Sequence, residues 1–177
     1  DRLATGACRR CTGSDVRGEE RGGAVKCVLA LGAGVLDWLG AGDKANAALI
    51  AGGITGIARL GVALGAKQET FGGLSGIGDL IVTCASMHSR HRRCGILIGQ
   101  GKGVAEAVEE IGMTVEGVRC AKAAYELSRK NNIYMPIVAG VYKVLYEDLP
   151  PDQVVRDLMA LPKRHESESV WLLTRQG

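Results

Sequence analysis

The sequence predicts an all-α fold, a single multi-helix domain with an aliphatic core. Apolar residues recur with helical spacing through most of the chain, and no set of segments shows the alternation of a convincing β-sheet. Hydrophobic residues make up 46% of the 177 residues, whereas aromatic residues make up only 4%. The chain also contains 26 glycines, which allow helices to approach each other closely. The core should therefore consist of aliphatic side chains and closely packed backbones.

The totals argue against several classes of protein. A net charge of +3, from 22 basic and 19 acidic residues, is too balanced to indicate a nucleic-acid partner. No run approaches the roughly 18 apolar residues of a membrane helix, and the N-terminus lacks the apolar segment of a signal peptide. Six cysteines are scattered, and Cys8 and Cys11 form a lone CxxC without the second pair that zinc needs. We therefore expect no metal, no membrane insertion, and reduced thiols in a cytoplasmic protein.

The N-terminal third is expected to hold a leader and two helices. Residues 1–23 are polar and show no period, so they are interpreted as a loose leader. Helical spacing begins at 24–40, where Gly40 and Gly42 end the helix, and Asp43 is a candidate N-cap for a second helix over 44–65. Its internal glycines would weaken an isolated helix by roughly 1 kcal/mol each. The two helices should therefore pack together through their Gly and Ala faces.

The remaining segments complete seven or eight helices. Residues 70–78 are rich in turn formers, 79–84 favour a helix over a strand, and 86–91 is expected to be a loop. Further helices are predicted over 92–100, 104–111 and 116–130, with Thr114 as a possible cap, and then from Pro136 and from Pro151. We place the helical domain at 24–168. The tail 169–177, with Val170-Trp171-Leu172-Leu173, has no evident partner.

The segment from Gly72 to Cys84 is the most suggestive of a binding site. It is glycine-rich, it carries Asp79, and it is followed closely by Ser89-Arg90-His91-Arg92-Arg93. Glycines let a backbone approach a ligand, and an arginine cluster suits a phosphate or an anionic dinucleotide. The segment is therefore predicted to line a site for a small phosphorylated substrate. A solvated basic loop is the alternative interpretation.

Three positions, two of them in or next to this segment, have both a structural and a functional interpretation. Lys26 lies in an apolar stretch, where it is either a surface lysine or a desolvated acid–base group. Asp79 is either a helix N-cap or a group that orients a lysine or binds a hydroxyl. His91 is either a hydrogen-bonded structural residue or a catalyst, and Glu116 by itself is a first-turn acid. No GxGxxG follows a strand, because Gly32-Ala33-Gly34 lies in a helical pattern, so the chain lacks the usual dinucleotide fingerprint.

Several motifs in one order resemble bacterial NAD(P)-dependent glycerol-3-phosphate dehydrogenase. The resemblance runs from about residue 10 to about residue 168 and covers only the C-terminal, substrate-binding half of that family. The stretches that carry it, besides Gly72–Arg90, are Gly22–Lys26, Ala30–Asp37, Gly40–Asp43, Ala58–Ala66, Thr114–Gly117 and Met135–Ile137.

The resemblance implies a fold like the C-terminal domain of 6-phosphogluconate dehydrogenase. It also implies an enzyme that interconverts dihydroxyacetone phosphate and sn-glycerol 3-phosphate with NAD or NADP, for glycerophospholipid synthesis. By resemblance, Lys26 is the proton donor and acceptor, and Asp79 belongs to the same polar cluster. Ser89, Arg90 and His91 match the run that holds the substrate, and Arg90, Thr114 and Glu116 match cofactor-lining positions. Residues 1–23 would be the end of a preceding Rossmann domain, which holds most of the cofactor.

The chain departs from the family pattern at several positions, among them Cys27 and His91 in the site motifs, the exchanged Lys44 and Asn46, and Ala51-Gly52-Gly53. Cys27 and His91 each stand where the family has asparagine, and neither offers the paired donor and acceptor of an amide. The alternative function is therefore an inactive truncated or diverged helical domain that acts only in binding or dimerisation. A homodimer is compatible with either function.

Overall fold

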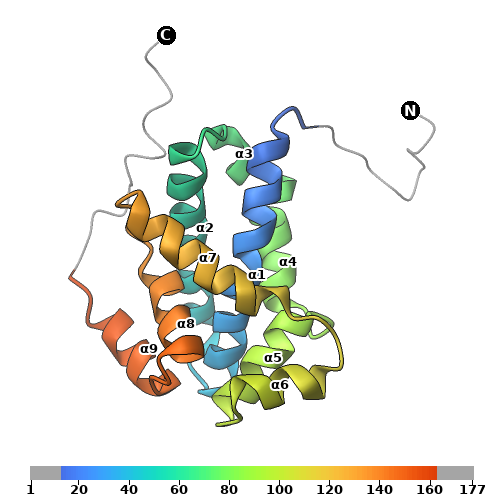
Figure 1. Ribbon diagram of the computed structural model, residues 1–177, viewed down its shortest axis with the longest axis vertical. Coiled ribbons are helices and arrows are strands. Elements are labelled where there is room, and N and C mark those ends of the chain that lie inside the picture. The colour runs from blue at the N-terminus through green and yellow to red at the C-terminus, as the bar shows by residue number, and fades with distance from the viewer. Residues whose placement is uncertain (1–12, 163–177) are drawn as a thin grey trace.

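Helix α1 (Val16–Trp38) runs through the centre of the molecule, and most other helices pack against it (Figure 1). The structure, a computed structural model, describes residues 13–162. Every residue of α1 from Cys27 to Gly34 is buried. A helix that is apolar and buried on all sides belongs to the interior of a domain. The expected aliphatic core is therefore organised around this one helix.

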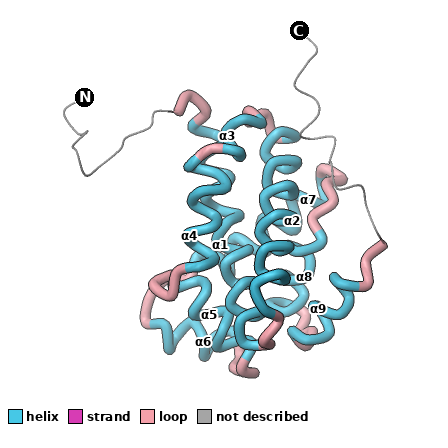
Figure 2. Tube along the Cα trace, turned by 180° about the vertical axis from the view of Figure 1, so that it is seen from behind, coloured by secondary structure: helices cyan, strands magenta, loops and turns pink. Residues whose placement is uncertain are grey.

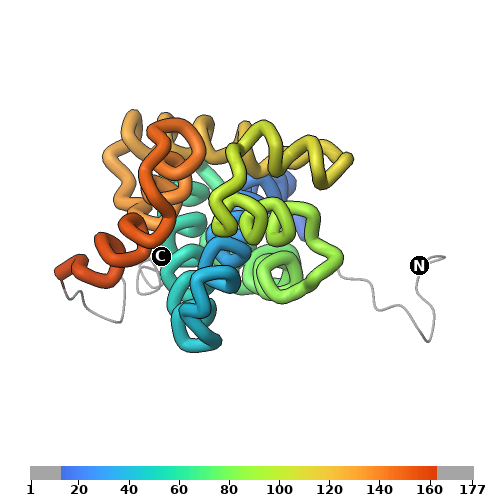
Figure 3. The backbone as a smooth tube through the Cα atoms, turned by 90° about the horizontal axis from the view of Figure 1, so that it is seen from below, coloured from blue at the N-terminus to red at the C-terminus, as the bar shows by residue number. Residues whose placement is uncertain are grey.

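The described residues form helices and no strands, which confirms the predicted fold class (Figure 2). Helix α7 lies across α1, while α8 and α9 pack on each other at one side of the molecule (Figures 1 and 3). The elements after α1 are α2 (Gly42–Ala63), α3 (Gln68–Gly72), a π-helical turn η1 (Leu74–Gly78), α4 (Asp79–Ala85), α5 (Arg90–Gly99), α6 (Val104–Ile111), α7 (Glu116–Lys130), α8 (Pro136–Tyr146) and α9 (Pro151–Met159).

The first helix begins at Val16, so the prediction of a loose leader up to residue 23 was wrong for its last eight residues. Asp15 caps the helix by accepting a hydrogen bond from the Gly18 backbone, at 3.0 Å. Its other carboxylate oxygen accepts bonds from Lys67 and Thr70, each at 2.7 Å. The first turns of α1 show no apolar periodicity, because they are held by the Asp15 cap and by small residues rather than by large apolar side chains. Residues 1–12 of the expected leader and the tail 169–177 lie outside the described residues.

Other expected helix ends were also wrong. The N-cap of α2 is Ala41 rather than Asp43, and that of α7 is Val115 rather than Thr114, both without a side-chain cap. Helix α5 begins at Arg90, inside the expected loop, because the Ser89 hydroxyl caps it. The stretch 70–78 holds α3 and the π-helical turn instead of simple turns. The helices opened by Pro136 and Pro151 were correctly predicted.

Glycines let α1 pack tightly against two partners. A Cβ on Gly53 of α2 would lie 2.4 Å from Leu29 Cδ1, so the predicted packing of the first two helices is confirmed. The crossing of α1 with α5 is closer still. A Cβ on Gly34 would lie 2.0 Å from the Arg92 oxygen, and one on Gly95 would lie 2.1 Å from the Leu31 oxygen. This backbone contact fixes the start of α5 relative to α1.

Helix α2 is the one described helix that is long and apolar enough to span a membrane by length and composition. It packs on α1, α3, α4 and α8, and its buried residues include three glycines and two isoleucines. The core helix of a folded domain meets the same criterion, so this property is weak evidence for a membrane-spanning helix.

Candidate functional site

Lys26 and Asp79 form an ion pair that joins α1 to α4. The lysine Nζ donates to Asp79 Oδ2, across 53 positions of sequence. The Lys26 side chain is 22% exposed and that of Asp79 is 40% exposed, so the pair lies at the surface end of the α1–α4 contact. The sequence-based expectation that these two side chains meet is confirmed.

Asp79 owes its position to the packing of the glycine-rich segment before it. Phe71, the only phenylalanine, is fully buried, and a Cβ on Gly61 would lie 2.1 Å from its ring. The π-helical turn then wraps so closely that a Cβ on Gly76 would lie 2.3 Å from the Phe71 oxygen. In this segment Gly76 is thus buried against protein backbone. The tight turn presents Asp79 as the first residue of α4.

Thr83 belongs to the same cluster, although the sequence reasoning gave it no role. It lies one helical turn after Asp79, and its hydroxyl donates to the Asp79 carbonyl oxygen at 2.6 Å. The same hydroxyl lies 3.4 Å from Asp79 Oδ1. Asp79 therefore meets Lys26 with one carboxylate oxygen and Thr83 with the other. The signal that could have found Thr83 is its i+4 spacing from a helix-starting aspartate.

Arg90 and Glu116 form a second, looser ion pair, between the first residues of α5 and α7. The nitrogen–oxygen distance is 3.5 Å, at the limit of a hydrogen bond, and Glu116 is 62% exposed. Arginine has five N–H donors in a planar fork. Because its contact with Glu116 is long and exposed, Arg90 keeps most of this capacity for a ligand.

Two of the predicted site residues contribute less directly. Ser89 is the N-cap of α5, where its hydroxyl accepts a hydrogen bond from the Arg92 backbone at 3.3 Å. Thr114 is exposed, in the loop before α7. The structure therefore gives Ser89 a capping role beside the site, and it places Thr114 near Glu116 in sequence without showing a contact to the Lys26 cluster.

His91 is buried beneath the site, with 6% of its surface exposed. A Cβ on Gly117 would lie 2.9 Å from its ring carbon Cδ2 and 2.7 Å from the Cys27 oxygen. Among the described residues, nothing forms a hydrogen bond with its Nε2. Burial lowers the pKa of the imidazole, and the nearby Arg90 and Lys26 charges lower it further, while Glu116 raises it. Two of the departures from the family pattern, Cys27 and His91, thus meet at the N-terminus of α7.

Arg92 does not lie in a solvated basic loop, the alternative interpretation of this segment. Its Nε donates to Asp37 at 2.5 Å and its Nη1 to the Ala85 oxygen at 2.5 Å. Asp37 also accepts a hydrogen bond from Asn46, at 3.0 Å, which joins α2 to the same contact. Arg92 is therefore occupied by the fold, whereas Arg93 is exposed. Of the three arginines, Arg90 is the one directed to the Glu116 side of the site.

The cysteines do not form a metal site in the part of the chain that is described. No group of three His, Cys, Asp or Glu side chains between residues 13 and 162 is placed to hold a metal ion. Burial raises the pKa of the Cys84 thiol to about 12 and that of Cys94 to about 11, so both are unreactive. The Cys8 and Cys11 pair lies outside the described residues.

The arrangement places positively charged hydrogen-bond donors, those of Lys26 and Arg90, at a polar site that is open to solvent. The Lys26 ammonium has three N–H donors, of which the Asp79 contact uses one. Together with Arg90, it can bind an anionic group and deliver or accept a proton at an oxygen atom. Arg90 is partly exposed and Glu116 is exposed, and the two suit one end of a larger polar cofactor.

Comparison with known proteins places the chain in a family. Residues 15–156 match the sequence family described as NAD-dependent glycerol-3-phosphate dehydrogenase C-terminus. The glycerol-3-phosphate dehydrogenase [NAD(P)+] of Clostridium perfringens is 54% identical over 155 residues, which cover 88% of this chain and 47% of that protein. The enzyme of the same name from Oceanobacillus iheyensis is 47% identical over 176 residues, covering 99% of this chain and 51% of its own length.

The fold agrees with these relatives. The crystal structure of glycerol-3-phosphate dehydrogenase from Coxiella burnetii superposes with a TM-score of 0.86 at 40% identity, over 90% of this chain and 49% of that one. The chain thus spans about half the length of the curated relatives it matches. It belongs to the NAD-dependent glycerol-3-phosphate dehydrogenase family, of which it carries the C-terminal domain.

Proposed function

We propose that this domain supplies the substrate site of an oxidoreductase that interconverts sn-glycerol 3-phosphate and dihydroxyacetone phosphate. The observation that carries the proposal is the Lys26–Asp79 pair, with Arg90 at the start of the neighbouring α5. Family membership supports the same activity, because the relatives are named for it. The product sn-glycerol 3-phosphate would serve glycerophospholipid synthesis.

Lys26 would act on the oxygen at carbon 2 of the substrate. In the reducing direction its ammonium donates a proton to the ketone oxygen as the carbon gains a hydride, and in the oxidising direction the amine accepts the hydroxyl proton. Asp79 would hold the lysine amine in position through Oδ2. Thr83 lies beside the aspartate, with its hydroxyl donated to the Asp79 carbonyl oxygen at 2.6 Å and 3.4 Å from Oδ1. The pair thus positions a proton without using all the donors of the lysine.

Arg90 would bind the substrate phosphate. A phosphate dianion offers a guanidinium several strong acceptors, whereas Glu116 offers a contact of 3.5 Å. Exchange of Glu116 for phosphate is therefore favourable, and it leaves the glutamate available to a cofactor. Ser89 would contribute by starting α5 at Arg90, and His91 by supporting the site from below.

The described residues fit one end of a nicotinamide dinucleotide. Arg90, Thr114 and Glu116 would contact it, since all three lie at the solvent side of the corner formed by α5 and α7. When bound, NAD or NADP supplies or accepts the hydride at carbon 2 of the substrate. The preceding half of the relatives, which this chain does not match, would hold the rest of the cofactor.

Turnover is tested by joining residues 13–177 to the nucleotide-binding half of the Clostridium perfringens relative. Reduction of dihydroxyacetone phosphate is followed by NADH or NADPH absorbance. We expect Lys26→Met to lower kcat by roughly 10²–10⁴-fold, the usual contribution of a positioned proton donor. Lys143→Met, at an exposed position of α8, is the matched control and should retain full activity.

Binding is tested separately, on the 177-residue chain. Calorimetry with sn-glycerol 3-phosphate should show binding that Arg90→Met weakens by about 10-fold to 100-fold, as expected for hydrogen bonds between charged groups. Arg93→Met, at an exposed position of the same helix, should bind like the parent. Binding without any turnover in the joined protein would favour the alternative, a diverged domain that acts only in binding or dimerisation.

The proposal includes a small-molecule substrate as the principal partner and a cytoplasmic location. Cys27, Cys84, Cys94 and Cys120 are free thiols, which suits a reducing compartment. Homodimerisation stays a prediction, with size-exclusion chromatography coupled to light scattering as its measurement.

A further inference from the structure

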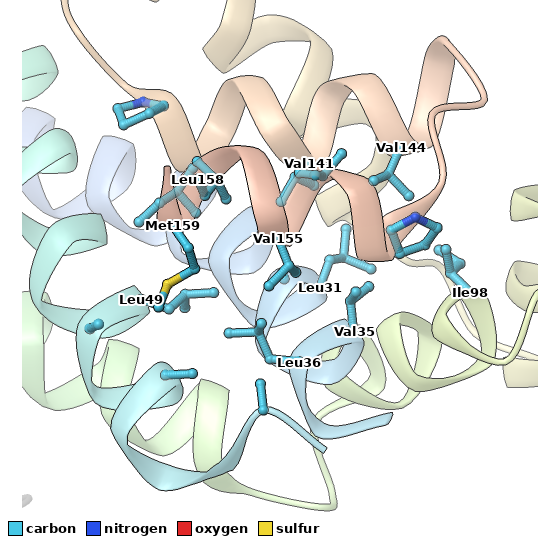
Figure 4. A pocket seen from close by; sticks show the side chains of 18 of the residues that line it. Leu31, Val35, Leu36, Leu49, Ile98, Val141, Val144, Val155, Leu158 and Met159 are labelled. Carbon is cyan, nitrogen blue, oxygen red and sulfur yellow. The ribbon is translucent and has the colours of Figure 1, made fainter. Parts of the chain in front are cut away.

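A deep apolar groove lies between α1, α2, α8 and α9, and it shares no residue with the Lys26 site. Its volume is about 440 Å³. Figure 4 shows that Leu31, Val35 and Leu36 of α1, Leu49 of α2, and Val155 and Leu158 of α9 point into one space. Among residues 13–162, Lys44 is the one charged side chain that lines it. Apolar surface of this extent is normally covered by another part of the same protein, by a partner or by a ligand.

We propose that this groove is covered by the chain's own C-terminal segment, with Val170-Trp171-Leu172-Leu173 as the occupant. Met159 and Leu161 both line the groove, so the polypeptide leaves its last described residue, Pro162, at the groove edge. The next seven residues, 163–169, are polar or charged, and the four apolar residues follow them directly. The apolar run is the one stretch of residues 163–177 that matches the chemistry of the groove walls.

The linker is long enough for the segment to double back along α9. Eight residue steps separate Pro162 from Val170, and an extended chain covers about 3.4 Å per step, or about 27 Å. Helix α9 has nine residues, so it is about 14 Å long. Val170 can therefore reach any point of the groove wall that α9 forms.

The shape and charge of the groove also suit this segment. On the α2 side its lining includes three alanines, Ala41, Ala45 and Ala48, whose small side chains leave room for a large one. An indole buries about 150–250 Å² and fills such a space efficiently. Glu166 and Glu168 precede the apolar run by a few residues, and Lys44 on the groove wall offers them an opposite charge.

Tryptophan fluorescence tests the proposal on the full 177-residue chain. The chain has two tryptophans, and Trp38→Phe leaves Trp171 as the single tryptophan, which is excited selectively at wavelengths that tyrosine does not absorb. We expect Trp171 to emit at short wavelength and to resist iodide quenching, as a buried indole does. Ala48→Arg, in the same background, places a charged side chain on the groove wall and should shift the emission to longer wavelength and restore quenching. Ala47→Arg is the matched control, because Ala47 is exposed on the same helix but does not line the groove.

A second variant keeps the test independent of changes in α2. Replacing Leu172 and Leu173 together with serine alters only the tail, and it should also shift Trp171 emission to longer wavelength and increase binding of the dye ANS to the uncovered groove. A solvent-exposed Trp171 in the parent would overturn the proposal, as would emission that Ala48→Arg leaves unchanged. A third outcome is that Trp171 emission shifts to longer wavelength when the protein is diluted, and that Ala48→Arg dissociates a dimer. This outcome would assign the groove to a second copy of the chain and would likewise overturn the proposal.

Discussion

Two ion pairs join α1 to its neighbours, and they differ in what surrounds them. Lys26 and Asp79, near the N-terminal half of α1, are 22% and 40% exposed, and Thr83 is the other side chain bonded to the aspartate. Asp37 and Arg92, near the other end of the helix, are 20% and 16% exposed. Asn46 and the Ala85 carbonyl add further bonds to this second pair.

The difference separates a pair that can bind a ligand from a pair that holds the fold. Asp37 and Arg92 tie α1, α2 and the end of α4 together, so a ligand would have to break structural bonds to reach them. Lys26 keeps two N–H donors beyond its bond to Asp79, and it is open to solvent on one side. The remaining hydrogen-bonding capacity, rather than the presence of a charge pair, marks the candidate site.

The largest effect is expected where α1 and α5 cross, because that contact fixes the start of α5, which carries both Arg90 and Arg92. Gly95→Val would place side-chain atoms where a Cβ already lies 2.1 Å from the Leu31 carbonyl oxygen. Backbone cannot move aside as a flexible side chain can, so we expect a loss of more than about 3 kcal/mol, above the usual range for overpacking. Urea unfolding, followed by circular dichroism, measures this loss in the free energy of unfolding.

Gly23→Ala is the control. A Cβ at Gly23 meets nothing within 4 Å, so this variant should instead stabilise α1 by up to about 1 kcal/mol. Equal stability of the two variants would contradict the close crossing.

The second largest effect is expected at Asp37. Asp37→Asn removes the carboxylate from Arg92, and breaking a largely buried pair costs about 3 kcal/mol at the lower end of its range. The same unfolding measurement applies, and substrate binding at the Lys26 site should persist under conditions where the variant is folded. Asp157→Asn, at an exposed position of α9, is the control. If Asp37→Asn is as stable as the parent but no longer binds substrate, then the Asp37–Arg92 pair would be the ligand-binding pair, contrary to this assignment.

Asp79→Asn should show the opposite pattern. The amide keeps the shape of the carboxylate but loses its charge, so Lys26 is held less firmly. Because the pair is partly exposed, the stability change should stay within about 1 kcal/mol. Turnover of the joined protein should fall by about 100-fold, the lower end of the contribution of a positioned proton donor. Retained turnover together with a large loss of stability would make Asp79 a structural residue.

Helix positions were predictable from the sequence where an apolar period set them, as in α6, α7 and α8. The first turns of α1 were not, because Gly18 and Gly22 are buried against Ala66 and Phe71, and small residues give no periodic signal. The spacing of Lys26 and Asp79 could suggest a contact only through resemblance to a family. Nothing local in either segment identifies the other as its partner.

The roles of the arginines were predictable only in part. Arg90, Arg92 and Arg93 stand within four positions, yet successive residues of a helix point about 100° apart. Arg90 therefore faces Glu116, Arg92 faces Asp37 of α1, and Arg93 faces the solvent. The close α1–α5 crossing decides which arginine faces which neighbour, and its glycines do not reveal their partner in the sequence.

His91 lies between Arg90 and Arg92 in sequence, and it gives the smallest expected effect. Burial and the charges of Arg90 and Lys26 lower its pKa below the ordinary 6.5, against the opposing effect of Glu116. As the pH falls past 6.5, the unfolded chain takes up the proton before the folded protein does. The free energy of unfolding should therefore fall as the pH is lowered from 7 to 5, by at most about 1.4 kcal/mol per pH unit for this one group.

His91→Asn removes the titrating group and should flatten this part of the profile, measured by urea unfolding at successive pH values. His88→Asn, at the exposed histidine three positions earlier, is the matched control and should follow the parent. Parallel profiles for the parent and His91→Asn would mean that the imidazole is as easily protonated in the fold as in the unfolded chain. A flatter profile would instead show that the fold lowers the pKa of this imidazole, first through burial and then through the nearby Arg90 and Lys26 charges.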